Sequence, residues 1–426
     1  MAHKIKLFAP AMLADPYPTY QRLRTEDPVH WEEPLRAWVL TRYDDIDYAL
    51  HEPRFASRLE DAWAPAVPKG STGDKRDADR AQQSLYSFVN NSLVFSDPPQ
   101  HTRLRALVSQ AFTPRAIEGS RPLIERLVDS FLDAAADNGT MDIVHDLAYP
   151  LPLMVIGALL GVQLDVSDCA QLKRWCDDFL LPFGRDPTTL TADERLHSRE
   201  GAAALSAFAH TLVKETRARP RENLLTLLVE AAEAGERLNE EELFATIVLF
   251  LIAGHENLTS LLSNGTLALL QQPDQLNLLK GGSVTWADAI PELMRYVSPN
   301  QFIRRRALAD ISLRDKTIQQ EQMVLLILAA ANRDPERFPN PDALDVSRPP
   351  TWNLALGHGP HYCLGAPLAQ LEAEITFGQL FKRFPALELA TARWEYENNF
   401  NVRLLKSLPV ALHAARAQEL QGAPGR

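Results

Sequence analysis

The chain has 426 residues, of which 46% are hydrophobic and 23% charged, a balance typical of a globular protein with a large buried core. Its formal net charge of -11 argues against a nucleic-acid partner, because phosphate binding requires clustered cationic surface. The three cysteines, Cys169, Cys176 and Cys363, do not suggest a disulfide framework. The first residues, MAHKIKLFAP, contain no long apolar stretch, so we expect neither a signal peptide nor a membrane anchor. These features predict a cytoplasmic protein that binds neither nucleic acid nor membrane.

The predicted elements begin with a hairpin over residues 28–43, where two β-rich runs flank EPLR. Residues 60–91 include KGSTGDKR and predict a long mobile loop. Apolar residues at three- and four-residue spacing then predict helices over residues 114–136, 199–234, 239–270 and 367–384. Residues 305–328 alternate like short strands, with a break at residues 314–316, and the proline-rich residues 332–350 predict an irregular but ordered meander. The pattern indicates a mainly α protein with a minor β component, formed by a single domain over residues 1–426.

The segment LGHGPHYCLG carries the strongest chemical signal in the chain. Gly357 and Gly359 precede Cys363, and Gly365 follows it, so backbone amides can approach the sulfur closely. Pro367 suits the first turn of a helix. Cys363 would then lie just before a helix N-terminus, where free amides and the helix dipole favour a thiolate.

Three interpretations of Cys363 remain open at this point. It is an inert thiol in a turn, or a zinc ligand together with His358 and His361, or the axial ligand of a haem iron. Zinc would need a fourth ligand, and no second Cys or His pair at finger-like spacing accompanies these residues. A thiolate on haem iron would increase electron density at the metal and promote O–O cleavage.

The same loop resembles the haem-binding signature of the cytochrome P450 family, Phe-Gly-x-Gly-x-His-x-Cys-x-Gly. The matching positions are Gly357, Gly359, His361, Cys363 and Gly365, with Leu356 where phenylalanine is usual. The resemblance implies that Cys363 ligates the iron of haem b and that Leu356, Gly357, His361 and Gly365 border the cofactor. Leucine keeps the site apolar, and we expect it to alter the packing beside the sulfur.

Glu292 and Arg295 are three residues apart on a predicted helix and therefore share one face. Such a pair is common on solvated helix faces. The resemblance implies instead a structural pair that locks the core beneath the haem. The family often supplies a third, basic member from the meander. This chain has Ala343 at that place, and Arg348 is the alternative partner.

His101 and Arg105 are four residues apart on the helix predicted after the two prolines of SDPPQHTRLR. Taken alone, the pair is typical of a basic, exposed helix face. The resemblance implies that both bind the haem propionates, since cationic donors form strong hydrogen bonds with carboxylates. It gives Arg305 and His361 the same role.

The long apolar helix containing AGHEN resembles the oxygen-binding helix of the family. Leu249, Ile252, Ala253, Glu256 and Asn257 recur at helical spacing along one stripe. Glycine costs about 1 kcal/mol inside a helix, and a buried acid is unfavourable without a partner, so we expect the helix to open locally. The resemblance implies that Ala253 contacts haem and that Glu256 and Asn257 organise protons. Asn257 stands where threonine is usual, and an amide can also donate and accept hydrogen bonds.

The resemblance covers nearly the whole chain and implies a monooxygenase of the soluble bacterial class. Such an enzyme takes electrons from ferredoxin and ferredoxin reductase, activates O2 and oxidises, most simply hydroxylates, a C–H bond. The apolar stripe suggests a fairly hydrophobic small molecule, such as a natural-product intermediate. Expected substrate contacts are Val94, Phe179, Phe183, Leu249, Ile252, Ala253, Asn300, Gln301 and Phe302.

For residues 179–183, ordinary core packing is the alternative to substrate contact. Two alternative functions also stay open. One is a member of the family that couples, desaturates or epoxidises its substrate. The other is a non-catalytic haem-thiolate binding or sensor protein.

Overall fold

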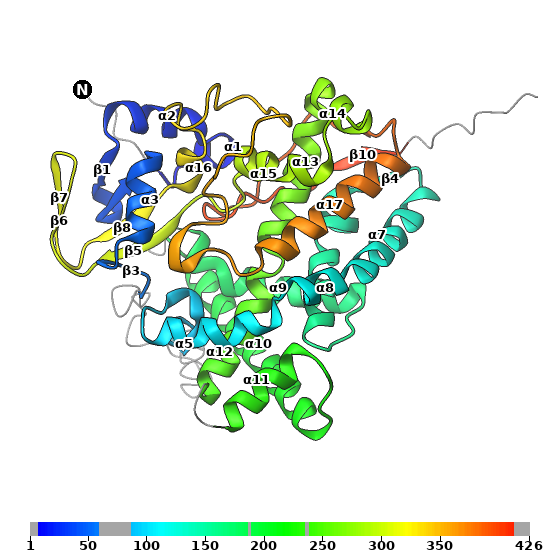
Figure 1. Cartoon of the computed structure of the whole chain (residues 1–426), viewed down its shortest axis with the longest axis horizontal. Helices are drawn as coiled ribbons and strands as arrows, with labels where there is room; N and C mark the ends of the chain where they lie inside the picture. Colours follow the sequence, from blue (N-terminus) through cyan, green and yellow to red (C-terminus); the bar gives the residue numbers. More distant parts are fainter. Residues whose placement is uncertain (1–6, 59–86, 186–188, 235–237, 413–426) are drawn as a thin grey trace, which may run out of the picture.

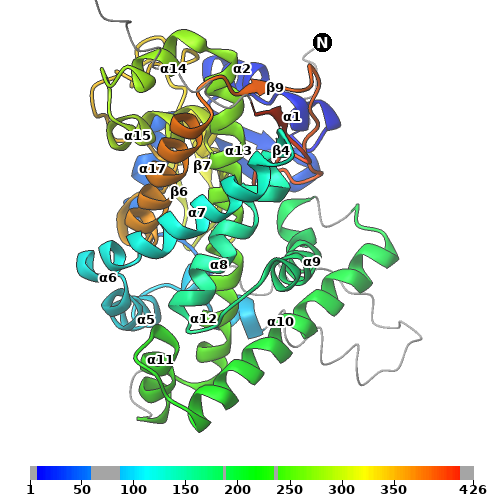
Figure 2. The same cartoon turned by 90° about the vertical axis from the view of Figure 1, so that its right-hand side faces the viewer.

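The computed structural model describes residues 7–58, 87–185, 189–234 and 238–412. A β-rich region gathers the N-terminal strands and the strands between residues 303 and 326 on one side, and helices form the rest (Figures 1 and 2). This agrees with the predicted mainly α class. Most of the predicted loop over residues 60–91 lies outside the described residues, and residues 87–91 are helical, so the loop prediction is wrong there.

The predicted hairpin is confirmed. Strands β1 (Val29–Glu32) and β2 (Ala37–Leu40) pair antiparallel around a short 3-10 turn, and Arg36 takes a left-handed conformation with φ 48°. The sheet continues through β8 (Met323–Leu326) and β5 (Ile303–Ala307) to β3 (Phe55–Ala56), in the order β1-β2-β8-β5-β3. Arg305 therefore lies on an interior strand of the sheet.

Strands β6 (Ile311–Leu313) and β7 (Lys316–Ile318) form a separate antiparallel pair. The chain turns between them at Arg314, which has φ 53°. This is the break that the sequence predicts between the short strands. A third small sheet orders β4 (Thr140–Asp142), β10 (Pro409–Ala411) and β9 (Glu388–Leu389).

Helices occupy every region for which the apolar periodicity predicts them. Their bounds are α1 (Pro10–Ala14), α2 (Tyr17–Glu26), α3 (Tyr43–His51), α5 (Gln100–Val108), α6 (Pro114–Gly119), α7 (Arg121–Ala136), α8 (Pro150–Leu159), α9 (Val166–Gly184), α10 (Ala192–Ala218), α11 (Leu224–Glu233), α12 (Glu240–Ala253), α13 (Glu256–Gln271), α14 (Pro273–Lys280), α15 (Trp286–Val297), α16 (Leu328–Ala331) and α17 (Ala366–Arg383). Three of the four predicted helices are divided. The predicted helix over residues 199–234 breaks around Pro220, because proline cannot continue a helix interior. Residues 332–350 have no regular helix or strand, as predicted.

The break between α12 and α13 matters most for the site. The segment Glu240–Gln271 is long and apolar enough to cross a membrane by composition, but 78% of its most apolar window is buried inside the protein, as in a core helix. The helix opens at Gly254 and His255, where the sequence predicts a local opening. One core cluster surrounds α13 and α17, and a second surrounds α8, α9, α10 and α12. The opened helix therefore joins both cores.

Candidate active site

The cysteine loop is closed by its own backbone. The N–H of Cys363 donates to the carbonyl oxygen of Leu356 at 3.0 Å, so the two ends of the loop meet. Gly357 and Gly359 have φ of +73° and +70°, a left-handed conformation that side chains rarely adopt. A Cβ on Gly359 would also lie 2.7 Å from the carbonyl oxygen of Leu50 in α3. Glycine is thus required for this loop to pack against α3.

The thiol of Cys363 lies one short turn before α17. Burial raises the pKa of this thiol, while backbone N–H groups of Gly365 and Ala366 and the guanidinium of Arg105 oppose the rise. Coordination to a metal ion deprotonates a thiol, so a bound iron would overcome the cost of burial. Cys169 and Cys176 are buried in the second core cluster.

Four cationic or potentially cationic side chains converge beside this loop. The rings of His101 and His361 lie 4.0 Å apart between centroids. Burial, followed by the cations of Arg305, His101 and Arg105, lowers the pKa of His361 to about 2. Arg105 donates from Nη2 to the carbonyl oxygen of Tyr362 at 2.7 Å, which ties α5 to the loop. Residues from α5, β5 and the cysteine loop therefore form one cluster.

In the described chain, the two arginines of this cluster have no carboxylate within ion-pair distance. Among the described residues, neither Arg105 nor Arg305 forms an ion pair, and Arg305 is only 6% exposed. Burial lowers the pKa of Arg305 to about 10, and Nε2 of the buried His101 has no hydrogen-bond partner in the described chain. Buried charges are normally paired, so the cluster fits a bound group that carries carboxylates. Haem, with two propionates, is such a group.

Two neighbours of this cluster were missed by the sequence reasoning. Ser57 lies with Oγ 3.0 Å from Nε2 of His361. Asp97 accepts hydrogen bonds from the backbone N–H groups of Ser57 and Arg58 at 2.9 and 3.0 Å. No local pattern marks either residue, because β3 brings Ser57 to the cluster through the sheet.

The two arginines that flank Arg305 have other partners. Arg304 donates to the carbonyl oxygen of Phe183 at 2.9 Å, and Arg306 pairs with Glu321 at 2.6 Å. Of the three consecutive arginines, Arg305 alone contributes to the pKa shifts of His101 and His361.

The stripe expected along the opened helix is divided between two environments. Ala253 is exposed in the middle of this otherwise buried helix, and Leu249 and Asn257, four residues to either side, are partly exposed. Leu249 and Ala253 are four residues apart on α12, so the open face of this helix is the one that they share. Asn257 follows on α13, and its buried Oδ1 has no hydrogen-bond partner in the described chain.

Ile252 and Glu256 are instead buried. Glu256 lines a cavity of about 110 Å³ together with Tyr149, Lys173 and Asp177. Burial, with a further contribution from Asp177, raises the pKa of Glu256 to about 8. Glu256 therefore carries its proton at neutral pH. Lys173 donates to Asp177 at 2.6 Å, so both charges lie on α9 beside the acid.

A buried histidine, whose role the sequence reasoning missed, holds the helix opening. Nδ1 of His255 lies 2.7 Å from the carbonyl oxygen of Leu251, and Nε2 lies 3.0 Å from the hydroxyl of Tyr149. Since a carbonyl can only accept, Nδ1 carries the proton and Nε2 accepts from Tyr149. Burial lowers the pKa of His255 to about 4, which keeps the ring neutral.

The Glu292–Arg295 pair is buried and joins the meander. Arg295 is 1% exposed and donates to both carboxylate oxygens of Glu292 at 2.6 and 2.8 Å. It also donates to three carbonyl oxygens, those of Asn332, Pro341 and Ala343. Nε of Arg348 lies 3.0 Å from Glu292, so Arg348 supplies the basic partner that Ala343 cannot.

The residues predicted to contact substrate lie in different surroundings. Val94 is 43% exposed, whereas Phe179, Phe183 and Ile252 are buried in the second core cluster. Phe179 and Phe183 stack on each other with ring centroids 5.7 Å apart.

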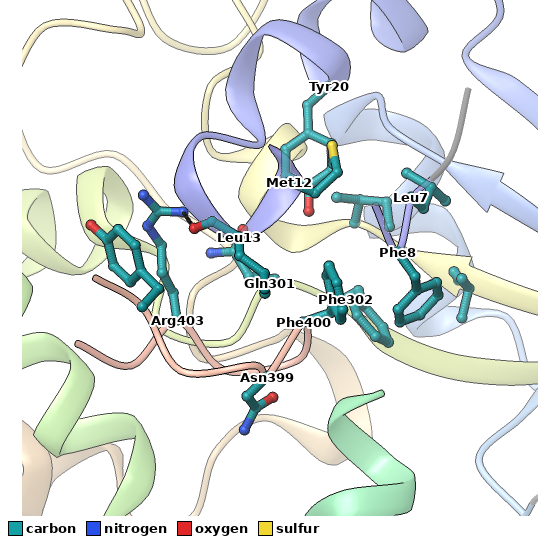
Figure 3. A pocket seen from close by; sticks show the side chains of 13 residues that line it. Leu7, Phe8, Met12, Leu13, Tyr20, Gln301, Phe302, Asn399, Phe400 and Arg403 are labelled. Carbon is teal, nitrogen blue, oxygen red and sulfur yellow. Dashed lines mark hydrogen bonds between the residues drawn. The ribbon is translucent and has the colours of Figure 1, made fainter. Parts of the chain in front are cut away.

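Gln301 and Phe302, from the segment before β5, line a small apolar cavity beneath Leu7, Phe8 and Met12 (Figure 3). The volume of this cavity, about 20 Å³, suits a water molecule rather than an organic substrate. Asn300 accepts a hydrogen bond from Asn401 at 2.9 Å. Substrate contact by Asn300, Gln301 and Phe302 stays a prediction.

The zinc interpretation of the cysteine loop has no geometric support. His361 turns to His101 and Ser57, whereas Nδ1 of His358 lies 2.5 Å from Asp47 on α3. The two histidines therefore do not converge with Cys363 on one point.

Comparison with known proteins agrees with this geometry. The Cytochrome P450 family profile matches residues 69–279 and 287–409. Cytochrome P450 107B1 of Saccharopolyspora erythraea is 38% identical over 414 residues, which cover 95% of this chain and 96% of that protein. The 6-deoxyerythronolide B hydroxylase of the same organism is 35% identical over 410 residues, covering 93% and 96% of the two chains.

Among solved structures, epothilone B-bound cytochrome P450epoK superimposes with a TM-score of 0.86 at 31% identity, covering 96% of this chain and 100% of that chain. Cytochromes P450 carry haem, which the unpaired donors around Cys363 fit. The chain therefore belongs to the cytochrome P450 family and is a cytochrome P450 monooxygenase.

Proposed function

We propose that this enzyme hydroxylates a C–H bond of a hydrophobic natural-product intermediate, as one catalytic domain over residues 1–426. The observation that carries the site assignment is the buried Arg305 beside the cysteine loop, because a buried arginine without a carboxylate within ion-pair distance implies a bound anionic group. When bound through the Cys363 thiolate, haem supplies the activation of O2. His101, Arg105, Arg305 and His361 would hold its propionates, and Leu356, Gly357, Gly365 and Ala253 would border the ring.

Proton supply is assigned to the opened helix. Glu256 keeps its proton at neutral pH and faces a cavity lined by Lys173 and Asp177, while Asn257 is partly exposed and has an unpartnered Oδ1. Glu256 would hold a proton on the cavity side, and the Asn257 amide would orient a water molecule or a substrate hydroxyl on the open side. The opening at Gly254 and His255 separates these two sides of the helix.

The substrate class is inferred from surroundings and from relatives. Leu249 and Ala253 are the predicted contacts on the open face of α12, and Val94 is exposed on the segment before α5. The relatives named above include a hydroxylase of 6-deoxyerythronolide B and a protein with bound epothilone B. Substrate contact through the buried Phe179, Phe183 and Ile252 would require their side chains to move.

Electron supply is assigned to separate proteins. Bacterial cytochromes P450 use small substrates, O2 and redox partner proteins, and we propose ferredoxin with ferredoxin reductase in the cytoplasm for this chain. Turnover reconstituted with a ferredoxin system tests this assignment. Equal turnover with the reductase alone would contradict it.

The first experiment tests the ligand and the substrate class together. Purified protein should give the red-shifted Soret band of a thiolate-ligated, reduced carbonyl complex, and Cys363→Ser should lose it. Cys169→Ser is the matched control and should keep the band, since Cys169 is buried in the second core cluster. A Soret shift on titration with hydrophobic natural products then identifies substrates. Persistence of the band in Cys363→Ser would contradict the ligand assignment.

The second experiment concerns Asn257. If its amide supports proton delivery, Asn257→Ala should release peroxide instead of product and lower coupling on the order of 100-fold, whereas Asn257→Thr should stay active. Full coupling of Asn257→Ala with the natural substrate would exclude the amide role. An analogue lacking the substrate's polar group would then show whether the substrate supplies the protons.

A second function, oxidative coupling, is favoured by Asn257 at the position where threonine is usual. A solved structure of an enzyme for C–S bond formation in chuangxinmycin biosynthesis also resembles this chain, with a TM-score of 0.82 and 31% identity. Product mass separates the possibilities. Hydroxylation adds an oxygen atom, whereas coupling or desaturation removes hydrogen without adding oxygen.

A further inference from the structure

His358 belongs to the cysteine loop but takes no part in the cationic cluster. It precedes the 3-10 turn Gly359–His361, and its side chain turns toward the last turn of α3. In Figure 1 this helix lies beside the orange loop that leads into α17. The function proposed above does not use the residues on this side of the loop.

Three ligand-type side chains meet at this contact. Asp47 and His51 are four residues apart on α3 and therefore share one face of the helix. Nδ1 of His358 lies 2.5 Å from Oδ1 of Asp47, and Nδ1 of His51 lies 3.8 Å from the same oxygen. One donor atom from each residue lies within 4.8 Å of the other two.

The backbone holds this arrangement in place. A Cβ on Gly359 would lie 2.7 Å from the carbonyl oxygen of Leu50, so the loop already touches the end of α3. Nδ1 of His51 donates to the main-chain oxygen of Asp47 at 2.8 Å, which restrains the imidazole and leaves Nε2 as its metal-ligand atom. Two ligand-type side chains from one helix and one from a packed loop therefore lie together before any metal ion binds.

We propose that Asp47, His51 and His358 form a binding site for a divalent transition-metal ion of the zinc class. Two imidazole nitrogens and one carboxylate oxygen are ligands that Zn2+ accepts at ~2.1 Å, and water would complete the coordination. The three ligand atoms would need to lie about 3.4 Å apart, the edge of a tetrahedron with ligands at that distance, so Nδ1 of His358 and Oδ1 of Asp47 would have to separate from 2.5 Å. About one third to one half of each side chain is exposed, so the side chains can rotate to these positions. Ca2+ and Mg2+ are disfavoured because they prefer oxygen ligands.

The ion would fasten α3 to the loop that carries Cys363. Without a metal ion, the hydrogen bond between Asp47 and His358 joins the two segments, and the ring of His51 lies edge-on to that of His358 at 4.3 Å between centroids. A bound ion would join them through all three residues. Trp352 lies 4.8 Å from His358 between ring centroids and is 45% exposed, so its fluorescence reports on the site.

The test uses the holoprotein after treatment with a chelator. Titration with ZnCl2 in a calorimeter should show one equivalent bound, and CuCl2 should quench the fluorescence that Trp352→Phe removes. His51→Ala and Asp47→Asn should each weaken Zn2+ binding about 10-fold or more, since loss of even a supporting contact weakens metal sites by 10- to 100-fold. Both residues lie on α3, outside the cysteine loop, so their variants can keep haem even where His358→Ala does not.

His197→Ala is the matched control, because His197 is an exposed histidine on α10. It should bind Zn2+ as the wild-type protein does. Binding that is unchanged in both His51→Ala and Asp47→Asn would overturn the proposal, as would the absence of Zn2+ binding by the wild-type holoprotein. The Soret band of each variant, recorded in parallel, separates loss of the metal site from loss of haem.

Discussion

At the scale of single residues, the burial of Arg305 indicates the kind of group that the protein binds. Its guanidinium is buried on β5 and donates to the carbonyl oxygen of Arg304 at 2.8 Å, and no carboxylate of the described chain pairs with it. An unpaired buried cation is unfavourable, so we expect an anionic group to bind beside Arg305. The same reasoning applies to the unpartnered Nε2 of His101.

We therefore predict that Arg305→Met weakens haem binding. Loss of one charge-assisted hydrogen bond, about 1.5–3 kcal/mol, corresponds to a decrease in haem affinity on the order of 10- to 100-fold. Titration of the apoprotein with haem, followed at the Soret band, measures this. Arg306→Met is the matched control, because Arg306 pairs with Glu321 and should leave haem affinity unchanged. Equal losses in both variants would mean that Arg305 has no specific contact with haem.

Glu372 is a second residue whose pKa is set by burial. It is 2% exposed on α17, and its Oε2 has no hydrogen-bond partner in the described chain. Burial raises the pKa of Glu372 to about 8. The folded protein therefore retains a proton that the unfolded chain releases above its ordinary pKa.

The sign of the pH dependence follows from this difference. Because the folded state binds more protons, the free energy of unfolding should fall as pH rises from about 4.5 to about 8. Glu372→Gln should match the wild-type protein at the acidic end and exceed it at pH 8 by on the order of 4 kcal/mol. Urea unfolding at both ends measures this, with the partly exposed Glu374→Gln as control. A Glu372→Gln variant with the wild-type pH slope would contradict the assignment.

At the scale of elements, the opening between α12 and α13 depends on one side chain. In a continuous helix, the backbone N–H of residue 255 would donate to the carbonyl of Leu251. Here Nδ1 of the His255 side chain contacts that carbonyl, and Tyr149 holds the other ring nitrogen. Gly254 is also required, because a Cβ there would lie 2.5 Å from the carbonyl oxygen of Phe250.

We predict that His255→Phe destabilises the protein by about 1–3 kcal/mol, because it leaves the Leu251 carbonyl and the Tyr149 hydroxyl unpaired. Tyr149→Phe should cost about 1 kcal/mol, and the double variant should cost less than the sum. Thr266→Val removes a buried hydrogen bond elsewhere on α13 and should be additive with Tyr149→Phe. Strict additivity of His255→Phe and Tyr149→Phe in urea unfolding would rule out the coupling.

At the scale of the whole molecule, buried ion pairs and hydrogen bonds, rather than helices or strands, hold the meander in place. Glu292 accepts hydrogen bonds from Arg295, from Arg348 and from the backbone N–H of Asp345. Arg295 in turn holds carbonyl groups on both sides of the meander. This network joins α15 to the segment that leads into the cysteine loop.

We predict that Arg348→Ala destabilises the holoprotein by about 2–4 kcal/mol, because Glu292 loses a buried cationic partner. Arg348→Lys should recover only part of the loss, since lysine lacks the planar fork of arginine. Arg383→Ala removes a surface pair with Asp133 and should change stability by less than about 1 kcal/mol. Thermal unfolding measures all three, and an Arg348→Ala variant as stable as Arg383→Ala would contradict the role.

The sequence by itself determined the fold class, part of the elements and the motifs. Apolar periodicity located four helical regions, EPLR located the hairpin turn, and the spacing around Cys363 selected the loop, because these patterns reflect local backbone and burial constraints. The opening of the long helix was also predicted, since a glycine and an acid are unfavourable within a buried stripe.

Only the tertiary structure decided which distant residues meet. The sheet brought Ser57 and Arg305 beside His361, and the fold placed Glu256 against Lys173 and Asp177 on α9. It also turned His358 away from Cys363 toward α3. The physical reason is that charge pairing and burial depend on side chains from separate elements, whose approach is set by packing rather than by spacing along the chain.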